Sequence, residues 1–558
     1  MGMIELNRKR AAVIGLGQSG LAMARWLARS GSDVLVFDDR AQPPGLDALH
    51  AQVPGATFHS RTLDAGVLDA AGQIDLLAWS PGVSCETGAG AALHAAARER
   101  GIPVHGELDF FMDAIATLRA QGAKTDVVAI TGTNGKTTVT RLCAFLANEA
   151  GLEAVAAGNI SPSMLDALMD RLGDLPIEPV PAPLQESAPE DESAPEDESA
   201  PESLPPSAAA AAMPRLWALE LSSFQLAVSQ PPACQAAVVL NVTPDHLDWH
   251  GSMENYRAAK LRIYPAAERR VVNLDDPLAD PDLPAPWEVP AEPEAPQPAK
   301  GRSRAKAKVE VPVLAPRTDF SLHTPHSAPA FGLVREGGLA WLTEALPEEV
   351  PGGRRRKAEP VDFVLNRLMP ADALRVQGAH NHANVLAALA LLRACDVPMR
   401  AMLHALRAFV TDHHRCEPVT VVNGIEYIDD SKGTNIGATV AALQGLGRRA
   451  VLIAGGVGKD QDFSLLAPAV AAHARAVVLI GRDAPILRAA LADTGVALED
   501  AADMDAAVRA GARLAQAGDV VLLSPACASF DMFRGYDHRG EFFAAAVRAM
   551  AEEAGQPC

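Results

Sequence analysis

Short apolar segments alternate with longer amphipathic ones at the start of the chain. Ala11–Gly15, Asp33–Asp38 and Ile74–Ser80 are largely apolar, and each ends in a turn that carries polar residues. Runs of this length are typical of buried strands in a parallel sheet, and the stretches between them suit crossover helices. Because open parallel sheets bind ligands beyond the carboxyl ends of their strands, these turns are candidate binding sites.

The same rhythm recurs further along the chain. Asp126–Thr131 is an apolar run that leads into a glycine-rich loop, and Leu216–Leu221 and Val238–Val242 are two more predicted strands. Four further predicted strands, separated by segments of helix length, lie at Gly424–Asp430, Ala450–Gly455, Ala476–Gly481 and Asp519–Ser524. The pattern therefore predicts an α/β protein built from repeated strand–helix units.

Three segments near 173–214, 280–318 and 345–360 do not follow this rhythm. The first contains a repeated Ser-Ala-Pro-Glu-Asp-Glu sequence that starts at Ser187, and Glu186–Glu202 carries eight acidic residues and no basic one. A tract with so few apolar side chains cannot offset the entropy lost on ordering, so we predict disordered insertions. They are interpreted as solvated loops, with a regulatory or partner-binding tail as the alternative.

The amino-acid composition argues against several classes of function. The chain has 558 residues, with 69 acidic and 49 basic side chains and a formal net charge of −20. An acidic chain of this kind lacks the basic face of a nucleic-acid binder or of a ligand for anionic membranes. No apolar run is long enough to span a membrane, and the seven cysteines are scattered without CxxC spacing. We predict a cytoplasmic protein with no nucleic-acid partner, no disulfide framework and no zinc cluster.

The first glycine-rich loop is Gly15-x-Gly17-x-x-Gly20, which lies between a predicted strand and a predicted helix. Acidic Asp38 and Asp39 stand at the end of the next strand. In dinucleotide-binding folds such glycines let backbone N–H groups approach a pyrophosphate at the helix N-terminus. The pattern alone leaves two interpretations open, a nucleotide site and a tight turn between strand and helix.

The second glycine-rich loop, Thr131–Thr138, reads Thr-Gly-Thr-Asn-Gly-Lys-Thr-Thr. Here the backbone N–H groups can cradle phosphates, Lys136 can reach the β- and γ-phosphates, and the Thr137 hydroxyl can bind Mg²⁺. The loop departs from the usual P-loop pattern because Ile130 takes the place of the first glycine. A chance Gly-Lys-Thr in a turn is the alternative to a phosphate site.

Possible metal ligands follow two predicted strands of the middle region. Glu220 ends one strand and His246 follows the other. A carboxylate and an imidazole beside a phosphate loop would suit Mg²⁺ bound to transferring phosphates, although His246 could equally be a capping or surface histidine and His250 is read as structural. Lys260 lies in a predicted helix, Tyr256–Tyr264; a partly desolvated lysine can react, but an ordinary lysine with its amine in water explains the same pattern.

These features predict three domains. We expect a Rossmann-like domain at 1–111, a central P-loop-type ATPase domain with a mostly parallel sheet at 112–411, and a Rossmann-like domain at 412–558. The three insertions fall inside the central domain. With a length of 558 residues, a division into several domains is expected, because single cores stop growing near about 250–300 residues.

A set of motifs, in order along nearly the whole chain, resembles the Mur ligase family. The motifs are Gly132–Thr138, Glu220–Gln225, Asn241–His246, Tyr256–Lys260, His380–Asn384, His414–Arg415, Asp430–Asn435 and Ser524–Ser529. The resemblance implies an ATP-dependent amide-forming ligase that adds D-glutamate to UDP-N-acetylmuramoyl-L-alanine through an acyl phosphate, in cytoplasmic peptidoglycan precursor synthesis. It also implies ATP and Mg²⁺ as cofactors and a monomeric enzyme.

The resemblance further implies the residues of each site. The UDP-substrate would be bound by Gln18, Ser19, Asp38, Arg40, Ser80, Gly82 and Asn159. ATP would be bound by Gly132, Thr133, Asn134, Gly135, Lys136, Thr137, Thr138, Asn384, Arg415 and Asp430. Metal would be bound by Thr137, Glu220, His246 and Lys260, the last carbamylated by CO₂. D-Glutamate would be bound by Lys432, Thr434, Lys459, Ser529, Phe530 and Tyr536. The catalytic set would be Lys136, His246, Lys260 and Lys459.

Three other functions remain as alternatives. A dinucleotide-dependent oxidoreductase would explain the first glycine-rich loop but not the second. A P-loop binding or switch protein would explain the second loop without ligase chemistry. A sibling ligase that takes another amino acid would share the nucleotide motifs, and it differs most from this sequence at Asp430–Asn435 and Ser524–Phe533.

Overall fold

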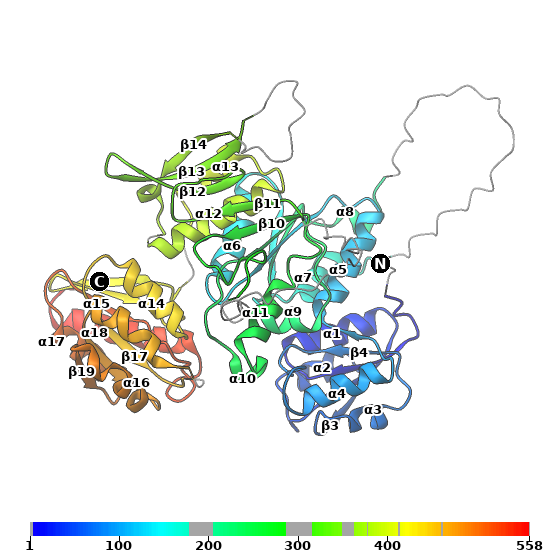
Figure 1. Ribbon diagram of the computed structural model, residues 1–558. Coiled ribbons are helices and arrows are strands. Elements are labelled where there is room, and N and C mark those ends of the chain that lie inside the picture. Colours follow the sequence, from blue (N-terminus) through cyan, green and yellow to red (C-terminus); the bar gives the residue numbers. More distant parts are fainter. Residues whose placement is uncertain are drawn as a thin grey trace, which may run out of the picture. The chain divides into compact units, whose positions relative to one another are not determined.

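The protein is described by a computed structural model that covers residues 4–177, 205–285, 315–348, 362–376, 378–410, 413–458 and 461–556. These residues form three β-sheets, each built from a successive stretch of the chain (Figure 1). They also divide into two compact units, one of Met1–Ile130, Ala147–Ala237 and Arg262–Arg269, and the other of Thr131–Leu146, Val238–Leu261 and Arg270–Cys558.

The first sheet has five parallel strands in the order β3-β2-β1-β4-β5. Its elements are β1 (Arg10–Ile14), α1 (Gln18–Arg29), β2 (Asp33–Asp38), α2 (Leu46–Gln52), β3 (Thr57–Ser60), α3 (Gly66–Ala71), β4 (Leu76–Trp79), α4 (Gly88–Glu99), β5 (Val104–His105) and α5 (Glu107–Ala120). The central strand β1 is apolar and almost wholly buried, as expected for a strand covered on both faces. The three predicted strands of this region are present, and β3 and β5 add to them.

The second sheet has nine strands in the order β14-β13-β12-β11-β10-β9-β6-β8-β7. Its strands are β6 (Asp126–Thr131), β7 (Ala154–Gly158), β8 (Leu216–Glu220), β9 (Ala236–Val239), β10 (Arg269–Asn273), β11 (Arg317–Phe320), β12 (Ala330–Glu336), β13 (Leu339–Pro347) and β14 (Phe363–Pro370). The helices of this stretch are α6 (Lys136–Glu149), α7 (Met164–Leu172), α8 (Ala208–Ala211), α9 (Ser223–Val228), α10 (Leu247–His250), α11 (Met253–Leu261), α12 (Ala379–Arg393) and α13 (Met399–Ala405), with a 3₁₀ turn at Ala371–Ala373.

The antiparallel end of this sheet was not predicted. Strands β12, β13 and β14 pair antiparallel, whereas β6 and β7 both pair parallel with β8. Most of the three predicted insertions lies outside the described residues, which do not include 178–204, 286–314 and 349–361. Described elements nevertheless extend into the predicted ranges, because α8, the start of β11 and the end of β13 fall within them.

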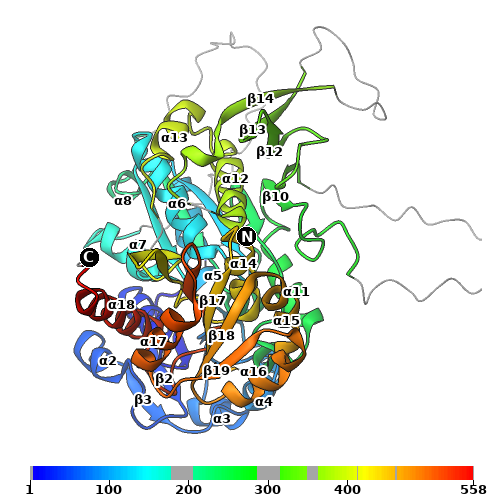
Figure 2. The same cartoon turned by 90° about the vertical axis from the view of Figure 1, so that its left-hand side faces the viewer.

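The third sheet has six strands in the order β15-β16-β20-β17-β18-β19 and is parallel except for β15. Its elements are β15 (Glu417–Val422), β16 (Ile425–Asp429), α14 (Ile436–Gly445), β17 (Ala450–Gly455), α15 (Ala467–His473), β18 (Ala474–Ile480), α16 (Ala484–Leu491), β19 (Ala497–Asp500), α17 (Met504–Leu514), β20 (Val520–Leu523) and α18 (Tyr536–Glu553), with 3₁₀ turns at Phe463–Leu466 and Ala492–Thr494. One face packs on α14, α15 and α16, and the other on α17 and α18 (Figure 2).

The predicted α/β class is confirmed in all three stretches of the chain. Each sheet is largely or wholly parallel, and helices separate most successive strands, as the alternating apolar runs indicated. Among the described residues, the exceptions are the successive strands β10 to β14 and the pair β15 and β16. The domain boundaries 1–111, 112–411 and 412–558 stay a prediction.

Candidate active site

The loop after β1 is held by a buried carboxylate at the end of β2. Asp38 is 1% exposed, and its Oδ2 accepts the backbone N–H of Leu16 at 2.7 Å. The loop also requires its last glycine, because a Cβ on Gly20 would lie 2.0 Å from the carbonyl oxygen of Gly15. A Cβ on Gly17 would meet nothing within 4 Å. The motif Gly15-x-Gly17-x-x-Gly20 therefore makes a tight turn whose third glycine permits close helix–strand approach.

The same carboxylate holds Arg40. The Arg40 Nε and one terminal nitrogen each donate to Asp38 at 2.8 Å, and the Arg40 backbone N–H donates at 3.0 Å. Burial would raise the pKa of Asp38, but the hydrogen bonds from Arg40 and from the Leu16 N–H outweigh it and lower the pKa below its usual value. The Arg40 side chain is about half exposed, at 52%, so its outer edge faces solvent.

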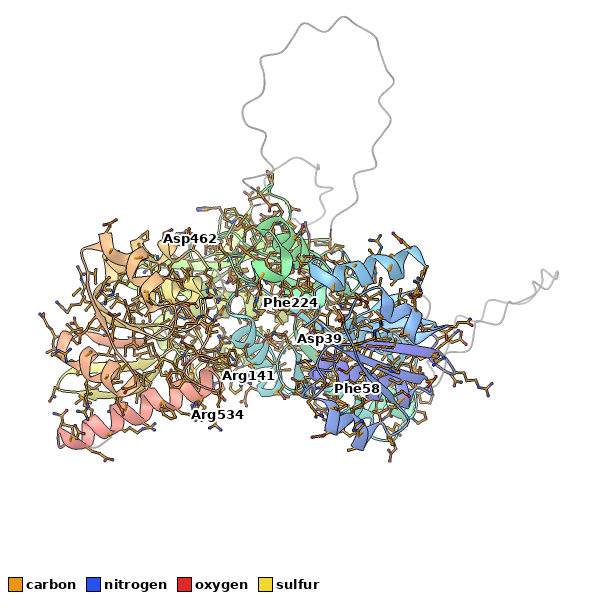
Figure 3. The ribbon with its side chains drawn as sticks, turned by 90° about the horizontal axis from the view of Figure 1, so that it is seen from below. Asp39, Phe58, Arg141, Phe224, Asp462 and Arg534 are labelled. Atoms are coloured by element: carbon orange, nitrogen blue, oxygen red, sulfur yellow. The ribbon has the colours of Figure 1, made fainter. Side chains whose placement is uncertain are left out.

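A cavity of about 570 Å³ opens beside this loop. Four of the residues predicted to bind the UDP-substrate line it, namely Asp38, Arg40, Ser80 and Gly82, together with Asp39, which Figure 3 labels. Gln18 and Ser19 lie in the first turn of α1, and Asn159 follows β7; none of these three is among its lining residues. The structure thus brings together four of the seven predicted residues around one cavity.

The loop after β6 carries two lysines that converge on one carbonyl. Lys136, the first residue of α6, donates from Nζ to the carbonyl oxygens of Gly132 and Thr133 at 2.9 Å each. Lys260 of α11 is 1% exposed and also donates from Nζ to the Gly132 carbonyl, at 2.9 Å, while lying 4.4 Å from the centroid of the Tyr256 ring. The amines of Lys136 and Lys260 therefore meet at one backbone oxygen of the loop.

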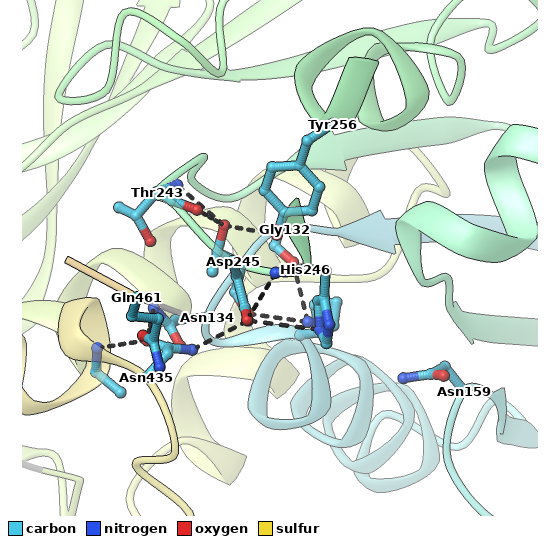
Figure 4. Close-up of polar contacts among 12 residues, drawn as sticks. Gly132, Asn134, Asn159, Thr243, Asp245, His246, Tyr256, Asn435 and Gln461 are labelled. Carbon is cyan, nitrogen blue, oxygen red and sulfur yellow. Dashed lines mark hydrogen bonds and ion pairs between the residues drawn. The ribbon is translucent and has the colours of Figure 1, made fainter. Parts of the chain in front are cut away.

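The shape of this loop is set by the segment after β9 (Figure 4). Asn241 accepts the Asn134 N–H through Oδ1 at 2.8 Å, and its Nδ2 donates to the Asn134 carbonyl at 3.1 Å. The Thr133 hydroxyl accepts the Thr243 N–H at 3.0 Å and lies 3.0 Å from the Tyr256 hydroxyl. Burial raises the pKa of Tyr256, so this phenol stays protonated and hydrogen-bonded.

Asp245 and His246 follow the same segment. The His246 N–H donates to Asp245 Oδ1 at 3.0 Å, and its Nε2 lies 3.5 Å from Asp245 Oδ2. His246 has a φ of 55°, in the left-handed region that non-glycine residues seldom occupy. Asn435, at the start of α14, joins this group, because its Nδ2 donates to Asn134 Oδ1 at 3.1 Å and to Asp245 Oδ2 at 3.4 Å (Figure 4).

A cavity of about 420 Å³ lies at the second loop. Six of the predicted ATP-binding residues line it, namely Asn134, Gly135, Thr138, Asn384, Arg415 and Asp430. Gly135 has a φ of +85°, and a Cβ there would lie 2.5 Å from the Asn384 Oδ1, so a larger residue would close this approach. Thr137 is buried in the first turn of α6.

Asp430 is the buried acid of this cavity. Its Oδ2 accepts the Ser524 hydroxyl at 2.7 Å. Burial raises its pKa to about 7, although that hydrogen bond and the charge of Arg415 act in the opposite direction. The two residues that flank Arg415, His414 and Cys416, both have positive φ values of 64° and 46°. His414 is anchored by Asp429, whose Oδ2 lies 2.6 Å from the His414 Nδ1.

Glu220, predicted to bind metal, ends β8. Its Oε1 accepts the Asn159 Nδ2 at 3.0 Å, so this predicted UDP-substrate residue lies beside a predicted metal ligand. The Glu220 Oε2 is buried and has no hydrogen-bond partner within the described part of the chain. The described residues hold no cluster of three or more His, Cys, Asp or Glu side chains that would bind a metal by itself.

The predicted D-glutamate residues lie on two loops of the third sheet. Lys432 and Thr434 follow β16, and Ser529, Phe530 and Tyr536 follow β20. Ser529 is 3% exposed whereas Phe530 is 76% exposed, and the Lys432 Nζ lies 5.1 Å from the Tyr536 ring centroid. Lys432 also lines the cavity at the second loop. Lys459, predicted to be catalytic and to bind D-glutamate, lies outside the described residues.

Several residues that shape the second site had no role predicted from the sequence. Asn241, Thr243, Asp245 and Asn435 were visible only as members of motifs. Asn241, Thr243 and Asn435 form hydrogen bonds with the loop, and Asp245 accepts hydrogen bonds from the His246 N–H and from Asn435. The Thr243 hydroxyl is buried without a hydrogen-bond partner among the described residues and lines the cavity, which suits a polar ligand. Asn273, Asp275, Asp276, Phe320 and His380 also line it, and residues so far apart in sequence give no local signal.

Among the described residues, no helix has both the length and the apolar character that crossing a bilayer requires.

Three family models match successive parts of the chain. They are the Mur ligase MurD-like N-terminal domain at residues 9–106, the Mur ligase middle domain at 130–281, and the Mur ligase glutamate ligase domain at 414–527. A UDP-N-acetylmuramoylalanine–D-glutamate ligase of Burkholderia thailandensis is 48% identical over 557 aligned residues, which cover 98% of each chain. The ligase of the same name from Burkholderia mallei is 47% identical with the same coverage. Among solved structures, a MurF ligase from Thermotoga maritima in complex with ADP aligns over 99% of this chain and all of its own, with 13% identity and a TM-score of 0.49.

Proposed function

This chain belongs to the Mur ligase family, and we propose that it is the ATP-dependent ligase that adds D-glutamate to UDP-N-acetylmuramoyl-L-alanine in peptidoglycan precursor synthesis. The observation that carries the proposal is the cavity at the second glycine-rich loop. Its walls join the phosphate loop at Asn134 and Gly135 with Asn384 of α12 and with Arg415 and Asp430 of the third sheet. A nucleotide placed there would have its phosphates on the loop and the N-terminus of α6, where N–H groups and the helix dipole favour anions.

The proposed reaction has two steps. The L-alanyl carboxylate attacks the γ-phosphate of ATP, which forms an acyl phosphate and releases ADP. The amine of D-glutamate then attacks the acyl carbon, loses a proton, and displaces inorganic phosphate as the amide bond forms. In this scheme Lys136 gives up its hydrogen bonds to the Gly132 and Thr133 carbonyls and donates to phosphate oxygens instead, since its Nζ already lies beside the loop.

Mg²⁺ would neutralise the phosphate charge that builds up during transfer. The proposed ligands are Thr137, Glu220, His246 and Lys260. The orphaned, buried Oε2 of Glu220 supports this, because a cation would supply the partner that the described residues do not. Mg²⁺ typically takes one or two carboxylates plus substrate phosphates and water, so the single carboxylate of Glu220 suits this ion.

Lys260 is proposed to react with CO₂ to form a carbamate. An amine attacks the CO₂ carbon through its lone pair and releases a proton to solvent as the N–C bond forms. The support for this site is that Lys260 is buried and donates to the Gly132 carbonyl of the phosphate loop. A carbamate keeps one N–H, which could go on donating to the Gly132 carbonyl. Its new negative charge would then be available to a second cation.

The two remaining substrates are assigned to the cavities and loops described above. The UDP-substrate would occupy the cavity beside the first loop, with Arg40 turned toward its diphosphate and with Gln18, Ser19 and Asn159 as further contacts. D-Glutamate would lie among Lys432, Thr434, Ser529, Phe530 and Tyr536, and Lys459 stays a predicted contact. We also propose the domain limits 1–111, 112–411 and 412–558, a cytoplasmic location, and a monomeric enzyme.

The test is product mass analysis after incubation with ATP, Mg²⁺, UDP-N-acetylmuramoyl-L-alanine and either enantiomer of glutamate. The proposal predicts a product with D-glutamate only, released together with ADP and phosphate. Carboxylate labelled with ¹⁸O should pass one labelled oxygen into the released phosphate. A product formed with another amino acid instead would identify a sibling ligase, and phosphate without label would contradict the acyl phosphate.

A further inference from the structure

The first turn of α18 packs against two loops that carry the proposed D-glutamate residues. One loop follows β16 and contains Ser431, Lys432 and Thr434; the other follows β20 and contains Cys527 and Ser529. The Ser431 hydroxyl donates to the carbonyl oxygen of Tyr536, the first residue of α18, at 2.7 Å. This hydrogen bond attaches the start of α18, which follows Arg534 (labelled in Figure 3), to the first loop.

Arg539, one turn into α18, connects both loops through a single guanidinium. Its Nε donates to the Ser431 hydroxyl at 3.0 Å, and one terminal nitrogen donates to the Ser431 carbonyl at 2.8 Å. The other terminal nitrogen donates to the Cys527 carbonyl at 3.0 Å. The side chain is 1% exposed, so water does not compete for these bonds.

The chemistry of the contact explains why the residue is an arginine. The hydrogen bonds to Ser431 and Cys527 all go to neutral oxygens, and they extend from the planar guanidinium in directions that one lysine ammonium cannot reproduce together. Burial lowers the pKa of Arg539 to about 10, and the charges of Asp531, Asp429 and Asp430 act against that decrease, so the group remains a cation at neutral pH. A buried cation of this kind is costly, which argues that its geometry matters.

The neighbouring residue shows how closely α18 approaches the site. A Cβ on Gly540 would lie 2.2 Å from the His414 Nδ1 and 2.6 Å from the Asp429 Oδ2. The helix therefore lies directly against the His414–Asp429 pair, and the ring centroid of its first residue, Tyr536, lies 5.1 Å from the Lys432 Nζ. A shift of α18 would displace both loops.

We propose that Arg539 is a positioning residue for the amino-acid substrate, because it sets the spacing between the Ser431–Lys432 segment and the Cys527–Ser529 segment. This inference rests on the proposed function of the same site. Arg539 acts through Lys432, Ser529 and Tyr536, and it is buried behind them rather than exposed to the substrate.

The experiment compares Arg539→Lys with wild type in steady-state kinetics. The variant keeps the positive charge but loses the fork, so we expect the KM for D-glutamate to rise about tenfold or more. The KM values for ATP and for the UDP-substrate should stay within about twofold. The matched control is Arg548→Lys, the same change at an exposed position of α18, which should leave all three constants unchanged.

A second variant covers the case in which Arg539→Lys does not fold. Ser431→Ala removes the hydroxyl that accepts from Arg539 and donates to Tyr536, and it leaves the backbone acceptor in place. It should raise the same KM by a smaller factor, and the effects of the two substitutions should not multiply in the double variant. A lower melting temperature or kcat with an unchanged KM for D-glutamate in both variants would show a purely structural role and overturn the inference.

The outcome also separates this inference from the proposed function. A wild-type enzyme that ligates D-glutamate while both variants keep its KM overturns only the role of Arg539. A wild-type enzyme that ligates a different amino acid overturns the proposed substrate, and the KM comparison is then made with that amino acid.

Discussion

The two glycine-rich loops follow equivalent strands and precede equivalent helices, yet they are built in opposite ways. In the first loop, Gly15–Gly20, the carboxylate of Asp38 on the neighbouring strand accepts a loop N–H. The same carboxylate also binds the cation of Arg40, which lines a cavity. In the second, Gly132–Thr138, the cation Lys136 is part of the loop and bonds its own carbonyls, while the amide of Asn241 fixes the loop. The glycines alone therefore do not decide what a loop binds; the groups supplied by neighbouring strands do.

The buried aspartates of the two sites also differ, because their pKa values are shifted in opposite directions. Asp38 has a pKa below its usual value because Arg40 and backbone N–H groups outweigh its burial. Asp430 has a pKa raised to about 7 because burial dominates over the Ser524 hydroxyl and the charge of Arg415. The first site therefore keeps a permanent ion pair, whereas the second holds an acid that gains or loses a proton near neutral pH.

The largest predicted effect separates the two loops by function. Lys136→Ala should lower kcat by about 10²–10³-fold or more, because it removes the cation closest to the transferring phosphate. The dissociation constant of the UDP-substrate should change by less than about twofold, since the first loop does not depend on this lysine. Coupled phosphate release and calorimetric titration would measure the two quantities. An equal loss of UDP-substrate affinity would contradict the assignment of separate sites, and Lys124→Ala, at an exposed position, is the control.

The next effect concerns the second loop alone. Lys260→Ala should lose activity to a similar extent, because the proposed carbamate disappears with the amine. Short carboxylic acids added to the variant should restore part of the activity, since a free carboxylate can take the place of the carbamate. The same acids should not restore Lys136→Ala, whose missing group is a cation. Full activity of Lys260→Ala without additives would exclude the proposed role.

The glycines of the first loop allow a matched test of stability. Gly20→Ala should destabilise the protein by about 1–3 kcal/mol, because its Cβ would overlap the Gly15 carbonyl oxygen. Gly17→Ala, where a Cβ meets nothing within 4 Å, should cost no more than about 0.5 kcal/mol. Chemical denaturation of the three proteins would measure the difference. Equal stability of the two variants would mean that the close approach of α1 to the strand is wrong.

The smallest predicted effect is a pH dependence of stability. Because folding raises the pKa of Asp430 from 3.8 to about 7, its favourable contribution is complete below the unfolded pKa and is lost as the pH rises through about 7. Asp430→Asn removes this titration, so the melting temperature of the variant relative to wild type should increase between about pH 4 and pH 7. Asp38→Asn should show no such increase, since the pKa of Asp38 is lowered. A constant difference for Asp430→Asn would show that this carboxyl ionises normally.

Much of the fold and site could be predicted from local patterns. Apolar runs predicted β1, β2 and β4, the phosphate-loop strand β6, and the central strands of the third sheet, because buried parallel strands need uninterrupted apolar side chains. The antiparallel strands β12–β14 were missed, although Gly337-Gly338, both with positive φ, form the two-residue turn that joins β12 to β13 and are a local hairpin signal. Asn384 and Arg415 were placed by resemblance alone, and the structure gives them a shared cavity.

The sequence by itself determined the class of fold, the positions of both glycine-rich loops, and the family, because these depend on strand length, on glycine spacing and on motifs that are contiguous in the chain. Only the tertiary structure decided which groups meet. It joined Lys136 and Lys260 on one carbonyl and linked Asn435 to Asn134. It also brought Arg539 to hydrogen-bond Ser431, which is 108 residues away in the sequence. Such contacts depend on the packing of distant segments, and hydrogen-bond partners and burial, which set the protonation of Asp38 and Asp430, exist only once that packing is complete.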